Sequence, residues 1–194
     1  MARTRSTMLE LGTPAPDFSL FNFNPPGPRP VMLSDFRNRR GILVAFICNH
    51  CPYVIHILHS FATFAADYEN RDIAVIAINA NDISTHPDDS PEQMTHIANE
   101  YGLSFPYLFD ADQSAARAYQ AACTPDFFLF NAGLQLYYRG QYDNARPGNG
   151  QPVTGKDLGA ATELLLAGKP APQHQLPSMG CNIKWQPGQE PDYT

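Results

Sequence analysis

Apolar residues in this chain gather in short runs that polar or proline-rich stretches separate. Residues 42–47 and 73–78 are two such runs without a single polar side chain. Runs this short and this apolar are typical of strands buried on both faces of a sheet. Between them, from Pro52 to about Asn70, apolar residues recur at helical spacing. A strand, a helix and a strand in this order predict a βαβ unit, so the sheet is at least partly parallel.

Shorter elements are expected along the rest of the chain. Pro91 follows Ser90, a pair typical of the first positions of a helix, and the polar residues 79–90 predict a loop before it. Asn131-Ala132-Gly133 lies between two apolar runs and predicts the turn of a β-hairpin. The elements expected after residue 90 are helices over 91–101, 112–119 and 156–167, a strand over 105–109, and hairpin strands over 127–130 and 134–138.

The two ends of the chain are rich in proline and lack a clear period. Residues 18–23 predict one short strand and residues 33–37 a single helical turn. In the tail, only the stretch Met179–Trp185 stands apart from the prolines. We therefore expect one α/β domain over residues 1–168, which includes an N-terminal extension, and a proline-rich C-terminal tail over 169–194 that packs on the domain.

Charge and composition narrow the possible partners. The 194 residues carry a formal net charge of −6 with a sequence pI near 5.4, and no block of Lys and Arg occurs. This balance argues against nucleic-acid binding, and no apolar run approaches the length of a membrane span. The first eight residues contain two arginines without an apolar segment behind them. We therefore expect no secretory signal, no membrane partner and a cytoplasmic protein.

Two cysteines, Cys48 and Cys51, stand between the first apolar run and the helix, directly before Pro52. Free amides and the dipole at a helix N-terminus stabilise an anion, so the pKa of a cysteine there is lowered. The chain has four cysteines, too few for a disulfide scaffold, and Cys-x-x-Cys in a reducing compartment is typical of redox or metal sites. We expect Cys48, at the turn, to be the exposed attacking thiol and Cys51 to resolve the mixed disulfide.

The order of these elements resembles the thioredoxin fold, in which Thr124-Pro125 would be the cis-proline beside the redox cysteines. Residues 12–18, 33–37 and 90–106 are similar to the added segments of peroxiredoxins and membrane-linked thiol reductases, and residues 180–185 to the tail of a peroxiredoxin-like subfamily. The chain is thus identified as a peroxiredoxin-like member of the thioredoxin superfamily, related to alkyl hydroperoxide reductase and thiol-specific antioxidant. The resemblance implies a central mixed β-sheet flanked by helices, with a peroxiredoxin-type insert and a C-terminal tail.

The same resemblance implies thiol–disulfide exchange without a cofactor, with disulfides or thiols of proteins or small molecules as partners. His50 would favour the thiolate, as in the oxidising members of the fold, and Pro125 would present its backbone to an extended substrate. The strand over 42–47 lacks the buried acid of thioredoxins, so the resolving cysteine needs another proton acceptor, and Asp126 is a candidate.

Three further residues near these positions are possible auxiliaries: Thr124, Cys123 and Cys181. Each of the two cysteines is either an extra resolving thiol or a reduced, partly buried side chain, since free cysteine often behaves as a small core residue.

Thiol-dependent peroxidase activity is the main alternative, with peroxides as substrates. Cys51-Pro52 resembles the peroxidatic cysteine of peroxiredoxins, but Cys48 replaces the Thr or Ser of that family, and residues 123–130 contain no Arg. Arg117 or Arg146 could replace the missing charge only if the fold brings it close. We therefore expect slow reaction with peroxide. A non-enzymatic redox sensor would keep the cysteines but show no turnover.

A zinc site is the second alternative, because Cys48 and Cys51 are followed by His56 and His59. These residue types suit zinc, but the histidines lie one to two turns into the helix on a face that only partly overlaps the cysteines. We expect no metal there, and we expect both histidines on the helix surface.

Overall fold

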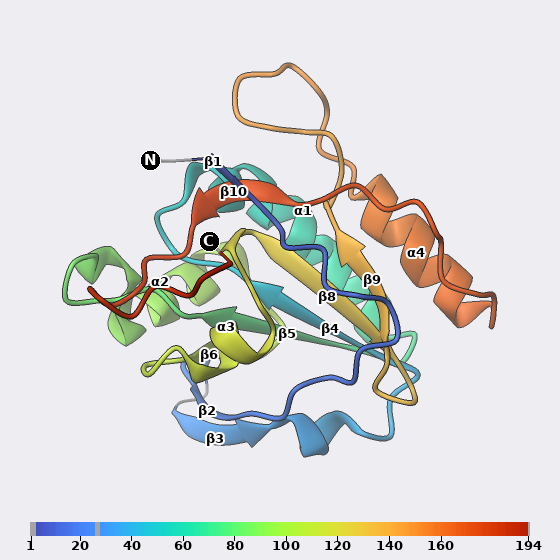
Figure 1. Ribbon diagram of the computed structural model, residues 1–194, viewed down its shortest axis with the longest axis horizontal. Coiled ribbons are helices and arrows are strands. Elements are labelled where there is room, and N and C mark those ends of the chain that lie inside the picture. The colour runs from blue at the N-terminus through green and yellow to red at the C-terminus, as the bar shows by residue number, and fades with distance from the viewer. Residues whose placement is uncertain (1–2, 26–27, 194) are drawn as a thin grey trace.

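A mixed sheet with the strand order β3-β2-β6-β5-β4-β8-β9 forms the centre of the computed structural model, which describes residues 3–25 and 28–193 (Figure 1). β4 (Gly41–Phe46) pairs in parallel with β5 (Ile73–Asn79) and in the antiparallel sense with β8 (Asp126–Asn131). The other strands of this sheet are β2 (Ser19–Asn22), β3 (Arg29–Met32), β6 (Tyr107–Phe109) and β9 (Leu136–Gly140). The expectation of a central mixed sheet is confirmed.

The helices flank this sheet on both faces (Figure 1). They are α1 (Pro52–Glu69), α2 (Pro91–Tyr101), α3 (Ser114–Ala118), α4 (Lys156–Leu166) and the 3-10 turns η1 (Leu33–Phe36) and η2 (Pro87–Asp89). Among the described residues, no helix has both the length and the apolar character needed to cross a membrane.

Alternation along the central strands explains why helices cover both faces. β4 is buried along its whole length. Leu43 and Ala45 belong to the core that includes residues of α1, α2 and α4, whereas Val44 belongs to the core that includes residues of α3 and the tail residues Ile183 and Trp185. Successive side chains of a strand point to opposite faces, so an uninterrupted apolar run fits a strand covered on both sides.

The βαβ unit is confirmed and fixes the position of the cysteines. β4 ends at Phe46, and α1 begins at Pro52 with Cys51 as its N-cap residue. Proline suits this first helical position because its missing N–H has no intrahelical partner to lose. The buried face of α1 consists of Val54, Ile57, Leu58, Phe61, Ala62, Phe64 and Ala65. Cys48 and Cys51 therefore lie at the edge of the sheet where β4 ends.

A second, small sheet lies over this edge and was not expected from the sequence. It has the order β1-β10-β7 and consists of β1 (Arg3–Arg5), β10 (Met179–Asn182) and β7 (Cys123–Thr124). Figure 1 shows β1 and β10 side by side near the start of α1. The tail stretch singled out in the sequence thus contains β10, which lies between β1 and β7 and pairs with both.

Two further details differ from the sequence-based expectation. The strand expected over 105–109 begins at Tyr107, consistent with the missing N–H of Pro106, which cannot donate to a ladder. The loop expected over 79–90 contains η2 (Pro87–Asp89), a short turn that ends on a buried carboxylate, Asp89. This turn places Asp89 in the candidate site.

Candidate active site

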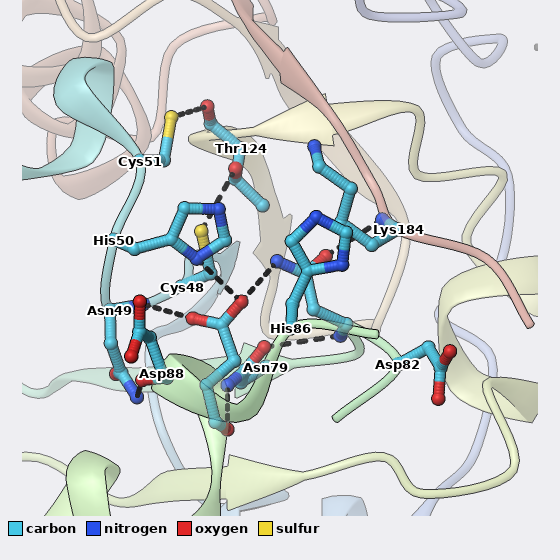
Figure 2. A network of polar contacts seen from close by, with 12 residues as sticks. Cys48, Asn49, His50, Cys51, Asn79, Asp82, His86, Asp88, Thr124 and Lys184 are labelled. Carbon is cyan, nitrogen blue, oxygen red and sulfur yellow. Dashed lines mark hydrogen bonds and ion pairs between the residues drawn. The ribbon is translucent and has the colours of Figure 1, made fainter. Parts of the chain in front are cut away.

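The two cysteines of the Cys-x-x-Cys motif lie on either side of Thr124, which belongs to β7 (Figure 2). The Cys48 sulfur is 3.4 Å from the Thr124 hydroxyl oxygen, and the Cys51 thiol donates to the Thr124 carbonyl oxygen at 3.2 Å. The peptide bond between Thr124 and Pro125 is cis, as the resemblance implies. The structure therefore brings together Cys48, Cys51, Thr124 and Pro125, which lie far apart in the sequence.

The expectation of an exposed Cys48 is wrong. Cys48 is 1% exposed and Cys51 is 0% exposed. β10 pairs with β7 so that Cys181 stands opposite Thr124, and this strand of the tail packs in the same apolar core as the two cysteines. The turn after β4 is therefore covered by a segment about 130 residues further along the chain, which local sequence features do not reveal.

The two thiols differ in their ease of ionisation. The neighbouring Cys48 thiol is the largest cause that lowers the pKa of Cys51 to about 4, and the Cys181 thiol and the Val54 amide in the first helical turn act in the same direction. Burial, this donated bond and the nearby Asp89 carboxylate raise the pKa of Cys48 well above its usual value. These directions favour the thiolate on Cys51, whereas the sequence led us to expect the attacking thiolate on Cys48.

His50 forms an ion pair with Asp89, with 2.8 Å between His50 Nδ1 and Asp89 Oδ2. This contact raises the pKa of His50. Asp89 is fully buried and also accepts hydrogen bonds from the backbone amide of Asn49 at 2.8 Å and from Asn81 Nδ2 at 2.7 Å. These donors outweigh the effect of burial and lower the pKa of Asp89. His50 is therefore engaged with a carboxylate of its own, which reduces the field that its positive charge exerts on the thiols.

We call the residues around this carboxylate the Asp89 network: Asn49, His50, Asn79, Asn81 and Asp89. Asn79 Nδ2 donates to the Asp89 carbonyl oxygen, and the His86 ring stacks on the His50 ring with 5.4 Å between centroids. The tail joins this network because the Lys184 amide donates to Asn81 Oδ1 at 2.8 Å. Figure 2 shows His86 and Lys184 on the opposite side of the network from Cys51. The sequence analysis missed Asp89 because nothing in a polar loop distinguishes a buried carboxylate from a solvated one.

Asp126, the proposed proton acceptor, is not part of this cluster. It is fully buried on β8 and accepts from the Ala122 amide, and burial raises its pKa to about 7. Its neighbour Phe127 faces the core that contains the cysteine pair, so alternation along the strand turns Asp126 to the opposite face of the sheet. Asp89 supplies the buried carboxylate beside the cysteines instead.

The two remaining cysteines face different surroundings. Cys123 is fully buried, and its sulfur contacts the Pro125 carbonyl oxygen at 3.6 Å. Cys181 is 3% exposed and belongs to the same core as Cys51. Burial, together with the neighbouring Cys51, raises the pKa of Cys181 to about 12. Cys181, and not Cys123, is therefore a direct neighbour of the candidate nucleophile.

The two arginines considered from the sequence both contact other groups of the protein. The Arg146 guanidinium donates to Gln141 Oε1 and to the carbonyl oxygens of Asp143 and Ala145, each at 2.6 Å. The Arg117 guanidinium lies 5.0 Å from the ring centroid of Trp185. Three of the five N–H donors of Arg146 are thus already used, and Arg117 lies against Trp185, so neither arginine is seen to contact the cysteine pair.

Only one group with the residue types of a metal site occurs within residues 3–25 and 28–193: Cys48, His50 and Asp89. One ligand atom from each lies within 4.8 Å of the others. It does not include His56 or His59, of which His59 is exposed and His56 half-buried on α1. Both oxygens of Asp89 already accept hydrogen bonds, so a metal would have to displace donors of the Asp89 network.

Comparison with known proteins finds a matching family model and two similar solved structures. Residues 11–139 match the model of the AhpC/TSA family. An uncharacterised conserved protein from Geobacillus kaustophilus is 46% identical, with a TM-score of 0.93 and coverage of 97% of this chain and 98% of that one. A hypothetical protein from Sinorhizobium meliloti is 48% identical, with a TM-score of 0.92 and coverage of 95% and 100%. A search of curated proteins finds no match.

More distant structures share the fold. A putative thiol:disulfide interchange protein DsbE from Chlorobium tepidum is 21% identical, with a TM-score of 0.61 and coverage of 81% of this chain and 99% of that one. This likeness confirms the thioredoxin-like fold.

Proposed function

The chain belongs to the AhpC/TSA family, and this membership supports a thioredoxin-like redox function. From this premise we propose that the protein is a thiol–disulfide oxidoreductase. The observation that carries the proposal is the position of Cys48 and Cys51 against Thr124 and cis-Pro125, with the thiolate favoured on Cys51. In this proposal Cys51 attacks a substrate disulfide and Cys48 resolves the mixed disulfide.

The proposed exchange has two steps, and only the second removes a proton from a thiol of the protein. The Cys51 thiolate attacks one sulfur of the substrate, and the other sulfur leaves as a thiolate. The Cys48 thiol then loses its proton and attacks Cys51, which releases the second substrate sulfur. His50 has a ring nitrogen within 4.8 Å of the Cys48 sulfur, and its pKa is raised, so His50 in its neutral form is our candidate for the acceptor of the Cys48 proton. The proposed partners are disulfides or thiols of proteins or small molecules in the cytoplasm.

A turnover assay tests the proposal with a peptide disulfide and excess dithiothreitol as reductant. Cys51→Ser should reduce the rate to that of the reagents alone, because the attacking sulfur is lost. Cys48→Ser should still attack the substrate once but lose normal turnover, because its resolving thiol is gone. Full turnover by the Cys51→Ser variant would contradict the assignment of the nucleophile. Absence of turnover in the wild-type protein would favour the redox sensor.

Peroxidase activity is the second candidate, favoured by the low pKa of Cys51 and by the family. Stopped-flow reaction of the fully reduced protein with hydrogen peroxide distinguishes the two. We expect slow reaction that ends in a Cys48–Cys51 disulfide, because Arg117 and Arg146 are both engaged elsewhere. Fast reaction through a Cys51 sulfenic acid would instead identify a peroxidase.

A further inference from the structure

Two basic side chains that the proposed reaction does not use, those of His86 and Lys184, gather beside His50 (Figure 2). The His50 and His86 rings are nearly parallel, with 16° between their planes and 5.4 Å between their centroids. A ring nitrogen of His50 lies within 4.8 Å of the Cys48 sulfur. We call His50, His86 and Lys184 the basic cluster, which thus borders the redox pair.

The positive charge of the basic cluster is only partly neutralised. His50 pairs with Asp89, but none of the ion pairs formed within residues 3–25 and 28–193 involves Lys184. The Lys184 ammonium group donates to the carbonyl and side-chain oxygens of Asn182, which carry no charge. Burial, followed by the charges of His50 and Lys184, lowers the pKa of His86. In a chain with a net charge of −6, this is a local site of positive potential that favours an anion.

Backbone hydrogen bonds hold the two outer members of the cluster in place. The Lys184 carbonyl oxygen accepts from the Asp82 amide at 2.8 Å and from Gln113 Nε2 at 2.9 Å. The His86 amide in turn donates to the Asp82 carbonyl oxygen at 3.0 Å. Asp82 therefore joins the tail to the loop before η2, and a ligand would not have to order either segment on binding.

The hydrogen bonds of His86 leave one ring nitrogen for a ligand. Thr85 Oγ1 donates to a carboxylate oxygen of Asp82 at 2.8 Å, since a carboxylate can only accept. The same hydroxyl oxygen is 3.0 Å from His86 Nδ1 and must accept from it. In the described part of the chain, no group forms a hydrogen bond with Nε2 of this half-buried ring. Nε2 would therefore bind an anion when the ring is protonated.

From this arrangement we infer that the basic cluster binds a carboxylate of the substrate, so that the preferred substrates are disulfides with a carboxylate close to the reacting sulfur. The inference rests on the proposed exchange reaction and names its substrate class. Lys184 supplies an ammonium group and His86 an N–H donor, one ring beyond His50. An extended peptide rises about 3.3 Å per residue, so the acid would lie within about three residues of the reacting cysteine.

The test measures the reaction of the reduced protein with three small disulfides of different charge: 3,3′-dithiodipropionic acid, 2-hydroxyethyl disulfide and cystamine. Acid quenching and intact mass give each second-order rate constant, and peptide mapping identifies Cys51 as the reacting cysteine. Lys184→Gln should lower the ratio of the rate constants for the carboxylate and the ammonium disulfide by about tenfold, since a charged hydrogen-bond donor is lost. Lys184→Arg should keep the ratio. Lys169→Gln removes an exposed lysine and is the matched control that should leave all three rate constants unchanged.

His86 adds a pH dependence to this ratio. The titratable groups that act on its ring are His50, Lys184, Asp82 and Asp89. A bound carboxylate favours the imidazolium form, so the wild-type ratio should rise as the pH falls from about 7.5 to about 5.5. Cys51 stays a thiolate over this range because its pKa is lowered to about 4. His86→Gln should remove the rise, and His96→Gln, at an exposed position of α2, should keep it.

An equal ratio for the wild-type and Lys184→Gln proteins would overturn the inference and leave the proposed function intact, because Cys51 would still exchange with the disulfides. If Cys51 reacts with none of them, both the inference and the proposed function fail. A salt series needs no substitution: an increase from about 0.05 M to about 0.5 M sodium chloride should lower the wild-type ratio by screening the cluster. A ratio that does not change with salt would contradict the inference.

Discussion

The two sides of the cysteine pair differ in what surrounds each sulfur. Cys51 lies at the start of α1 against the Thr124 carbonyl and the tail cysteine Cys181, where amide and thiol donors favour a thiolate. Cys48 lies against the Asp89 network, where the charge of a buried carboxylate adds to the effect of burial and favours a thiol. Two cysteines three positions apart thus differ in acidity because their partners come from different parts of the chain. The spacing of the motif brings them together, but the surrounding elements assign their roles.

The two sides also differ in the elements that cover the cysteines and in how readily those elements open. The side of Cys51 is covered by β10, a strand of four residues between the three-residue β1 and the two-residue β7. The side of Cys48 is closed by buried polar groups that share several hydrogen bonds with Asp89. A small sheet of strands this short opens more readily than a satisfied buried network. Access to the thiolate should therefore come from the side of the tail.

Among the substitutions considered, Gly180→Ala should change access to the cysteine pair the most. The added Cβ would lie only 1.9 Å from the Thr124 carbonyl oxygen. Overpacking of this kind costs about 3 kcal/mol at its upper range, so β10 should detach from β7. Alkylation of Cys51 by iodoacetamide should become faster by about tenfold or more, because each 1.4 kcal/mol of opening free energy is a factor of about ten.

Gly159→Ala provides the control for this experiment. Its Cβ would meet its nearest neighbour, the Tyr68 hydroxyl oxygen, at 3.7 Å, which is ordinary contact. This substitution lies in α4 and should leave Cys51 alkylation unchanged. Equal alkylation rates for Gly180→Ala and wild-type protein would show that β10 does not control access to the cysteine pair.

Asp89→Asn should affect the other side by a smaller amount. It removes the charge that His50 pairs with, and we expect a loss of about 1.5 kcal/mol in the free energy of unfolding. The pKa of folded His50 is raised, so its contribution is complete below about pH 6.5 and is lost as the pH rises through the folded pKa. The pKa of folded Asp89 is lowered, so its contribution is present above about pH 3.9 and is lost as the pH falls through the folded pKa.

The difference in stability between wild-type and Asp89→Asn protein should therefore be largest between about pH 4 and pH 6.5, as measured by urea unfolding across this range. The same variant should lower the pKa of Cys48, because the Asp89 charge is one cause of its increase. Asp88→Asn changes an exposed neighbour and is the matched control. A pH-independent difference, or an equal one for both variants, would contradict the ion pair with His50.

The sequence predicted the elements whose signals are local. Uninterrupted apolar runs gave β4 and β5, helical spacing gave α1, and the resemblance gave the cis peptide bond before Pro125. Asp126 was a mistaken candidate. It directly follows Pro125, which lies beside the cysteines, but its side chain faces the other side of the sheet.

The missed parts of the site depend on contacts between distant segments. Asp89 meets His50 through a turn in a loop that has no periodicity, so only the packed chain shows that the carboxylate is buried. β10 is too short and too rich in small residues to be distinguished from the loops around it. The one available signal was the stretch Met179–Trp185, whose cysteine and apolar residues interrupt the prolines of the tail.

Thr124→Val should produce the smallest effect and distinguishes the two cysteines most directly. The Thr124 hydroxyl contacts Cys48, whereas the Thr124 carbonyl oxygen accepts from Cys51 only while Cys51 is a thiol. Removal of the hydroxyl therefore alters only the Cys48 side. The Thr124 hydroxyl lowers the pKa of Cys48, so its loss should raise that pKa further and slow the resolving step by about two- to tenfold, the equivalent of one hydrogen bond. The first attack by Cys51, followed as a separate phase in stopped flow, should keep its rate, and Thr124→Ser should restore the resolving step. A slower first phase in the Val variant would mean that the Thr124 side chain also supports the Cys51 thiolate, and the division of roles between the two sides would have to be abandoned.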